Sequence, residues 1–309
     1  MIAQPSAPLR LGTRASPLAM AQAHMVADAL CRAHGWTADA IELRPVTASG
    51  DKVLDRPLAE IGGKALWTKE LDISLMQGEI DFSVHSMKDV ETIRPDELVI
   101  AAMLPRADVR DRLIGADSII ALAHGARIGT SSPRRAAQLR HIRPDLDIVM
   151  FRGNVDTRLR KLAEGEADAT LLAAAGLVRL GRVDVGTAIA VEEMLPAASQ
   201  GAIGIEARAD RHDIRALLAE INDSDTFDCV MAERSLLEAL TADCHSPVAA
   251  YATVRENGLL LRAEILSEDG SERVALGIGV KRGETEGCFQ MAQQLLAAAS
   301  PDLRALFGA

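Results

Sequence analysis

Apolar and polar positions along the first two thirds of the chain switch repeatedly between strand-like and helix-like spacing. Short apolar runs indicate strands, whereas apolar residues recurring every three to four positions indicate helices with one buried face. Pro17 suits the first position of such a helix. The expected elements of this part are strands at 9–12, 41–46 and 81–86 and helices at 17–33 and 66–76.

The same rhythm returns from about residue 126 to residue 180, after a seam at 105–113. The longest apolar run of the chain, 171–178, fits a buried strand that leads into a helix. Short strands alternating with helices are typical of βαβ units, which build a mostly parallel sheet. The two blocks therefore predict two α/β domains with a cleft between them.

The last third of the chain has a different pattern. A helix is expected at 227–240 and another at 285–299, and between them lie three strand-like segments at 248–256, 259–267 and 272–281. The dipeptides Asn257-Gly258 and Asp269-Gly270 separate these segments, and such pairs favour tight hairpin turns. This part predicts a small α+β domain with a three-stranded antiparallel sheet.

Composition narrows the class of protein. The net charge is −10 and aromatic residues make up only 3% of the chain, so a general nucleic-acid binder is not expected. We read no secretory signal, and no apolar run approaches the roughly 18 residues that span a bilayer. The four cysteines are scattered without a Cys-x-x-Cys pair, which favours a cytoplasmic protein with reduced thiols and no metal site.

A cluster of hydroxyl and basic residues follows the strand expected near residue 129. Ser132 and Pro133 suit the start of a helix, which places Arg134 and Arg135 in its first turn. The helix dipole disfavours cations there by about 0.3–1 kcal/mol each. Two arginines and three hydroxyl residues at a helix start indicate an anion pocket, although a solvated charged turn would give the same pattern.

Three further junctions between strand and helix carry polar side chains. Arg152-Gly153-Asn154 follows one strand, and Arg158 lies one helical turn later. Another strand ends at Lys88-Asp89, where the aspartate is either a catalytic carboxylate or half of a surface ion pair. Arg14 and Ser16 occupy the junction nearest the N-terminus. Because ligands of α/β sheets bind at the carboxyl ends of strands, we expect one cleft lined by arginines, with one acidic group.

Cysteine 244 stands in a loop between an expected helix and an expected strand, in the segment Asp243-Cys244-His245. A single cysteine is more often a small core residue than a reactive one, but the loop position favours a function. The sequence contains no GxGxxG, HExxH or GxSxG motif, so dinucleotide, zinc-protease and serine-hydrolase chemistry is not indicated.

Six segments in this order resemble the porphobilinogen deaminase family, and together they extend over most of the chain. They are 9–19, 62–70, 84–89, 129–135, 152–159 and 200–202. The resemblance implies two α/β domains like those of type II periplasmic binding proteins and a third, α+β domain that carries a cofactor cysteine. The implied boundaries are 1–104 with 199–219 for domain 1, 105–198 for domain 2 and 220–309 for domain 3.

The resemblance also implies the chemistry. Four molecules of porphobilinogen condense head to tail with loss of ammonia, on a dipyrromethane cofactor held by a thioether to Cys244, and Asp89 is the catalytic carboxylate. Lys64 and Trp67 match a segment over the active site. The implied partners are porphobilinogen and the next enzyme, uroporphyrinogen-III synthase, and the chain is expected to be a monomer. The residues expected to hold cofactor and substrate are Arg14, Ser16, Lys88, Thr130, Ser131, Ser132, Arg134, Arg135, Arg152, Gly153, Asn154, Arg158, Arg179 and Gln200.

Two departures from the family pattern bear on these expectations. Ala242-Asp243 precedes the cysteine where the family has Gly-Gly, which restricts the backbone and adds a negative charge beside the anchor. Ala198-Ser199 precedes Gln200 where the family has Val-Gly. A small-carboxylate binding protein and an inactive deaminase relative therefore remain alternative interpretations.

Overall fold

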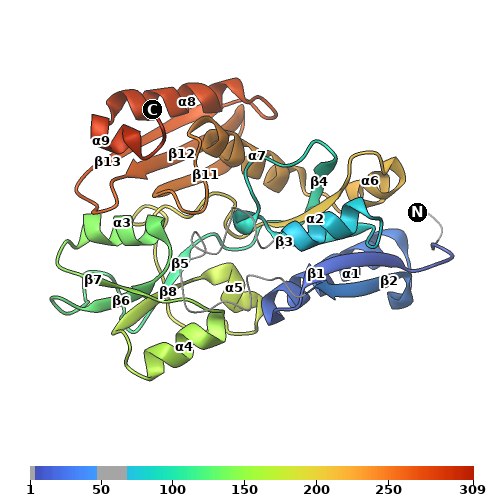
Figure 1. The fold of residues 1–309 in the computed structure, drawn as a ribbon, viewed down its shortest axis with the longest axis horizontal. Coiled ribbons are helices and arrows are strands. Elements are labelled where there is room, and N and C mark those ends of the chain that lie inside the picture. Colours follow the sequence, from blue (N-terminus) through green and yellow to red (C-terminus); the bar gives the residue numbers. More distant parts are fainter. Residues whose placement is uncertain (1–3, 47–67) are drawn as a thin grey trace. The chain divides into compact units, whose positions relative to one another are not determined.

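The computed structural model describes residues 4–46 and 68–309, and the chain divides into two compact units (Figure 1). The first consists of Met1–Ala107 and Ala202–Phe227, and the second of Asp108–Gly201 and Asp228–Ala309. The second unit contains both an α/β sheet and the C-terminal antiparallel sheet, so the division into three domains stays a prediction. No helix of the described ranges has the length and apolarity needed to cross a membrane.

The first unit is built on a five-stranded sheet with the order β2-β1-β3-β10-β4. Strand β1 runs parallel to β2 and β3, whereas β10 is antiparallel to both β3 and β4. Its elements are β1 (Leu9–Arg14), α1 (Pro17–His34), the 3-10 turn η1 (Ala38–Ala40), β2 (Ile41–Val46), α2 (Lys69–Met76), β3 (Phe82–Ser86), the 3-10 turn η4 (Met87–Asp89), β4 (Leu98–Met103), β10 (Ile203–Arg208) and α6 (His212–Ala219).

Helix α1 shows how local sequence fixes the frame of this unit. Ser16 caps its first turn by accepting the N–H of Ala19, Pro17 occupies the first helical position, and Gly35 ends the helix with a φ of 72°. Ala23, Val26 and Leu30 of α1 are wholly buried in a core that the helix shares with β1, β3 and β10. The cap and the buried face together fix where β1 ends and therefore where Arg14 and Ser16 lie.

The α/β part of the second unit repeats this plan. Its sheet has the order β7-β6-β8-β5-β9, in which β6 is parallel to β7 and β8, whereas β5 is antiparallel to β8 and β9. Its elements are β5 (Asp111–Ile114), β6 (Arg127–Thr130), α3 (Pro133–Ile142), β7 (Asp147–Met150), α4 (Val155–Ala163), β8 (Ala169–Ala173), α5 (Ala174–Arg179) and β9 (Thr187–Ala188).

Each five-stranded sheet is mostly parallel, as expected, but contains one reversed strand, which is β10 in the first sheet and β5 in the second. The βαβ rhythm correctly indicates the parallel pairs. Strand β10 joins the first sheet from a distant part of the chain, and β5 is the first strand of its own stretch but pairs with β8 and β9, so a local pattern does not reveal these antiparallel neighbours. Two α/β sheets of the same strand order, with a small antiparallel sheet, confirm the fold class.

The C-terminal part forms a three-stranded antiparallel sheet, as predicted. Its strands are β11 (Val248–Arg255), β12 (Gly258–Leu266) and β13 (Arg273–Val280), and its helices are α7 (Ser224–Ala239), α8 (Glu286–Ala298) and α9 (Pro301–Ala305). Arg255 pairs with Gly258, so the first hairpin turns at Glu256–Asn257, one residue earlier than predicted. Buried residues of α7, α8 and the sheet form one continuous core.

Ser199 adopts a left-handed backbone conformation that glycine tolerates more readily. Its φ is 63°, its side chain is buried, and its N–H donates to Glu233 Oε2 at 2.6 Å. A left-handed backbone costs a residue with a side chain about 1–2 kcal/mol, which glycine would not pay. The greater freedom of glycine in the unfolded chain offsets part of the stability gained by removing this strain. The family pattern has glycine at this position.

We therefore expect Ser199→Gly to raise the free energy of unfolding by about 0.5–1 kcal/mol. Urea denaturation of the variant beside the parent chain measures the difference. A less stable variant would show that contacts of the serine side chain outweigh the backbone strain.

Candidate functional site

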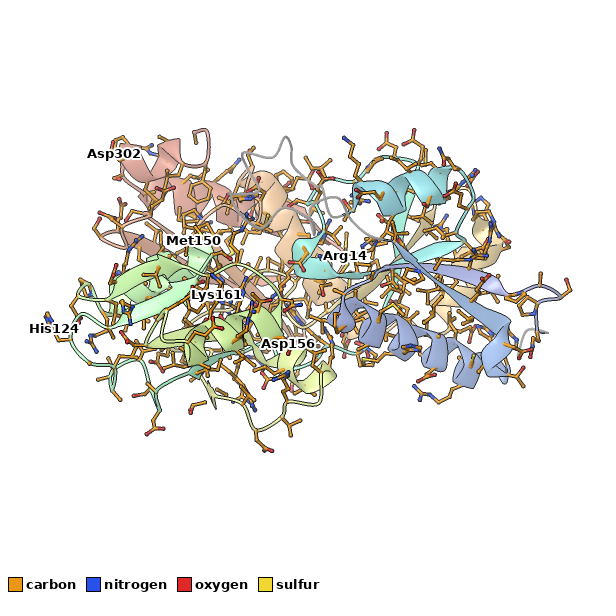
Figure 2. All side chains as sticks on the ribbon, turned by 60° about the horizontal axis from the view of Figure 1, so that its bottom comes forward. Arg14, His124, Met150, Asp156, Lys161 and Asp302 are labelled. Carbon is orange, nitrogen blue, oxygen red and sulfur yellow. The ribbon has the colours of Figure 1, made fainter. Side chains whose placement is uncertain are left out.

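The first unit brings three predicted residues to one cavity. Arg14 is the last residue of β1 (labelled in Figure 2), Ser16 caps α1, and Asp89 ends the short turn that follows β3. All three line a cavity together with His85 and Ser86. The strand ends thus meet at one edge of the sheet, as expected, and the cavity presents a cation, a hydroxyl group and a carboxylate to a ligand.

The turn that carries Asp89 is held in place by contacts with the beginning of β10. Met87 is buried, and its N–H donates to the carbonyl of Ala202 at 3.1 Å. A Cβ atom on Gly204 of β10 would collide with the sulfur of Met87, so the missing side chain leaves room for the turn. Lys88 and Asp89 consequently project from a fixed backbone, although the cavity lining includes only Asp89.

A buried acid–base network lies beside this cavity and was missed in the sequence. Glu206 is fully buried on β10, where Arg94 donates to its Oε1 at 2.8 Å and His85 Nε2 lies 3.3 Å from its Oε2. Burial alone would raise the pKa of the Glu206 carboxyl, but His85 and Arg94 outweigh this effect and lower that pKa to about 2. The ionised Glu206 therefore fixes His85 in the wall of the cavity.

In the second unit, Arg134 and Arg135 converge on a carboxylate that the sequence analysis did not identify. Arg134 donates to Asp111 Oδ2 at 2.8 Å, and Arg135 donates to Asp111 Oδ1 at 2.7 Å. Ser132 caps α3 and Pro133 follows it, as predicted, so both arginines occupy the first turn. The predicted Gln200 also donates to Asp111 Oδ1, at 2.8 Å.

This arrangement differs from an open anion pocket, because Arg134, Arg135, Gln200 and Asp111 are all at most 5% exposed. Burial alone would raise the pKa of Asp111, but the charges of Arg135 and Arg134 hold it far below its usual value. Two guanidinium groups on one carboxylate leave a net positive charge at the start of α3. Asp111 thus explains why two cations are tolerated where the helix dipole opposes them.

The arginine pair is connected to the C-terminal sheet. Arg134 also donates to Gln138 Oε1 at 2.9 Å, and the amide of Gln138 donates to Glu264 Oε1 at 2.5 Å. Glu264 lies buried on β12 and pairs with Arg273 at 2.6 Å. A continuous chain of charge-assisted bonds therefore connects β12 with Asp111 on β5.

The second polar junction of this unit follows β7. Asn154 caps α4 by accepting the N–H of Thr157, and Gly153 has a φ of 112° in a position where a Cβ atom would meet Thr157. Arg158 donates to the carbonyl of Gly153 at 3.0 Å and to Ser131 Oγ at 3.2 Å. The two predicted junctions of this sheet are thus in direct contact.

The remaining residues of this junction lie around that contact. Arg152 is half-buried two residues after the end of β7. Thr130 is buried, and its hydroxyl accepts the N–H of Ser132 at 3.2 Å, so Thr130 holds the loop rather than presenting its hydroxyl to solvent.

Arg179 is a largely buried cation, and no carboxylate of the described residues pairs with it. It ends α5 and donates to the carbonyl of Gly201 at 2.6 Å, while its buried Nε has no hydrogen-bond partner in the described part of the chain. Burial lowers the pKa of Arg179 to about 10, and no charge among the described residues counteracts it. A largely buried cation without a counter-ion in 4–46 or 68–309 indicates a site for an anionic ligand.

Cys244 lies exposed in the loop between α7 and β11, with its Sγ 3.5 Å from His245 Nδ1. Asp243 does not adopt a left-handed backbone; among the described residues other than glycine, only Ser199 and Thr241 do. The replacement of glycine by Asp243 therefore costs no backbone strain of that kind. Lys64 and Trp67 lie outside the described residues.

Comparison with known protein families identifies the family of this chain. The family model described as "Porphobilinogen deaminase, dipyromethane cofactor binding domain" matches residues 9–216, and the model described as "Porphobilinogen deaminase, C-terminal domain" matches residues 227–299. The chain belongs to the porphobilinogen deaminase family.

Relatives named porphobilinogen deaminase agree over most of their length. The protein of Sphingopyxis alaskensis is 58% identical over 99% of this chain and 98% of its own. That of Paracoccus denitrificans is 52% identical, with 88% of each chain covered. Membership in the deaminase family makes the alternative of a small-carboxylate binding protein unnecessary.

Solved structures also resemble this deaminase-family chain, at low identity. Substrate binding domain 2 of Lactococcus lactis GlnP has a TM-score of 0.45 at 12% identity, covering 77% of this chain and 93% of its own. The second substrate binding domain of a putative amino acid ABC transporter from Streptococcus pneumoniae has a TM-score of 0.43 at 12% identity, covering 75% and 94%. Likenesses of this degree support no conclusion about ligands.

Proposed function

We propose that this chain is a porphobilinogen deaminase, a transferase that condenses four porphobilinogen molecules with loss of ammonia into linear hydroxymethylbilane. The product grows on a dipyrromethane cofactor attached to Cys244. The observation that carries this proposal is the match to both family models and to the 58% identical relative over nearly the whole chain. The dipyrromethane supplies a covalent anchor for the growing chain when it is bound.

The charge distribution of the described residues suits such ligands. Each porphobilinogen unit carries two carboxylates, so a growing chain becomes a polyanion within a protein of net charge −10. The second unit offers the positive charge left over at Asp111, together with Arg152, Arg158 and Arg179. Guanidinium groups bind carboxylates through two parallel hydrogen bonds, which makes arginine suited to this lining. Arg14, Ser16 and Lys88 serve carboxylates on the first unit.

Asp89 has a different role. When ammonia leaves porphobilinogen, positive charge develops over the pyrrole ring and its nitrogen. The Asp89 carboxylate accepts the pyrrole N–H and stabilises that charge as it forms. Its place in a cavity beside Arg14 and Ser16 allows one substrate molecule to meet its carboxylate partners and the catalytic group together.

The wider assignment follows from the same proposal. The enzyme acts as a cytoplasmic monomer, binds neither nucleic acid nor membrane, and passes hydroxymethylbilane to uroporphyrinogen-III synthase. Gln200, Thr130 and Ser132 act by holding Asp111 and the start of α3, whereas Ser131, Gly153 and Asn154 shape the junction at Arg158.

Arg179 provides a test of anion binding. We expect Arg179→Met to raise KM for porphobilinogen about tenfold or more, because a charge-assisted hydrogen bond is worth about 1.5–3 kcal/mol. The same change should leave the free energy of unfolding equal or higher, since it removes a buried cation that has no counter-ion in the part of the chain that the structure describes. Steady-state kinetics and urea denaturation measure the two effects.

The matched control is Arg160→Met, which removes an exposed arginine of α4. We expect this variant to match the parent chain in both measurements. An Arg179→Met protein that is destabilised but has an unchanged KM would make Arg179 a structural residue and remove it from the binding site.

A further inference from the structure

The loop around Cys244 is held by its own side chains. The N–H of His245 donates to Asp243 Oδ1 at 2.8 Å, and the N–H of Asp243 donates to Ser246 Oγ at 3.1 Å. The N–H of Ser246 donates back to the carbonyl of Asp243 at 3.1 Å. The loop therefore presents Cys244 and His245 in a defined conformation.

One nitrogen of His245 faces both neighbours. His245 Nδ1 lies 3.5 Å from Cys244 Sγ and 3.5 Å from Asp243 Oδ1. A neutral imidazole can accept the thiol proton at this nitrogen, and the resulting Nδ1–H then lies between a thiolate and a carboxylate. The two negative groups stabilise the imidazolium together. A nucleophile with an adjacent base is the arrangement found where thiols are activated, and here Asp243 holds the base through the backbone N–H of His245.

We propose that His245 is the general base for attachment of the cofactor to Cys244, and that Asp243 is its positioning residue. This inference rests on the proposed function, because it concerns the step that loads the enzyme. It also gives a role to Asp243, the residue that departs from the family pattern. A carboxylate beside a thiol by itself opposes ionisation of the thiol, but Asp243 contacts the imidazole, whose positive charge it favours.

The attachment step balances without any further reactant. A bond forms between Cys244 Sγ and the aminomethyl carbon of a porphobilinogen unit, and the bond between that carbon and its nitrogen breaks. The aminomethyl group reacts in its protonated form and leaves as ammonia, and the thiol proton passes to His245 Nδ1 and then to that ammonia, which departs as ammonium. After attachment the sulfur is a thioether and has no proton to transfer. Cys244 and His245 therefore act together only while the cofactor is being attached.

The thiol itself gives a readout that does not depend on turnover. The full chain, produced without porphobilinogen, is alkylated with iodoacetamide over a range of pH, and labelling of the Cys244 peptide is followed by mass. Cys229 and Cys288 are buried, and burial raises the pKa of the Cys31 and Cys288 thiols, so Cys244 should react first.

We expect the parent chain to react about threefold to tenfold faster than His245→Gln at pH 7, because more of its thiol is ionised. Above about pH 10 the two rates should meet, or the variant should become slightly faster, since its thiolate is the more basic nucleophile. Asp243→Asn keeps an acceptor for the loop and should give an intermediate rate at pH 7. His124→Gln, on an exposed loop (Figure 2), should match the parent chain.

Loading is then followed directly, as the mass gained when each protein is incubated with porphobilinogen. The proposal predicts slower gain in His245→Gln than in the parent chain and in His124→Gln. Equal alkylation profiles, or equal loading rates, for His245→Gln and the parent chain would contradict the role of His245 alone. A parent chain that never gains mass would contradict the proposed function and this inference with it.

Discussion

Replacing Asp89 by asparagine is expected to lower turnover of porphobilinogen by about a hundredfold or more while the cofactor stays attached. Removing one preorganised group that stabilises transition-state charge typically costs a factor of about 10²–10³. Asparagine is almost the same size, so the turn η4 and the buried Met87 keep their places. The loss should therefore appear in kcat, measured on protein whose mass shows it to be loaded.

A matched control is Asp96→Asn, which neutralises an exposed aspartate of the same unit. It should retain the rate of the parent chain. Near-normal turnover in loaded Asp89→Asn would remove Asp89 from the mechanism. Loss of both loading and turnover would instead place its role in assembly of the cofactor.

Asp111→Asn is expected to cause the largest loss of stability, about 3–5 kcal/mol. The change leaves two buried guanidinium groups without their counter-ion, and breaking a buried ion pair on one side typically costs this much. The loss should be read from urea denaturation. The exposed Asp117→Asn of the same unit serves as its control and should stay within about 0.5 kcal/mol.

The direction of the pKa shift of Asp111 determines at which pH its stabilising effect is present. The pKa of Asp111 in the folded chain lies far below its unfolded value of about 3.9, so the stabilisation is fully present above that value. It is lost only as the pH falls below about 4. The difference between parent and variant should hence be constant from pH 6 to pH 8 and shrink in acid. A difference that changed between pH 6 and pH 8 would assign the effect to another group.

A double variant shows whether the lost stability comes from unpaired buried charge or from another disturbance of the fold. Adding Arg135→Met to Asp111→Asn removes one of the two unpaired cations, so the double variant should be less destabilised than the two single losses added together. Strictly additive losses would show that Asp111 and Arg135 do not act as one buried group.

The sequence predicted those features that short-range chemistry determines. Ser132 and Pro133 mark the start of α3, Pro17 marks the start of α1, and the structure has both helices there. The short helix α9 was missed although Ser300 and Pro301 carry the same signal. The end of β1, which bears Arg14, and the turn after β3, which bears Asp89, also lie together as expected, because carboxyl ends of adjacent parallel strands meet at one edge.

Features that depend on distant contacts could not be predicted in this way. Arg134 and Asp111 are 23 positions apart, and Arg94 and Glu206 are 112 positions apart, so no local pattern shows that they pair. The local pattern at Arg134 and Arg135 indicates an anion pocket or a solvated charged turn, whereas both arginines lie buried on Asp111. The antiparallel strands β5 and β10 escaped prediction for the same reason.

The denatured mass of the purified protein tests the central proposal most directly. We predict an excess over the polypeptide equal to two porphobilinogens less two ammonias, located on the Cys244 peptide and missing from a folded Cys244→Ser variant. A bare polypeptide mass that persists after incubation with porphobilinogen, or an excess that survives in Cys244→Ser, would contradict the account.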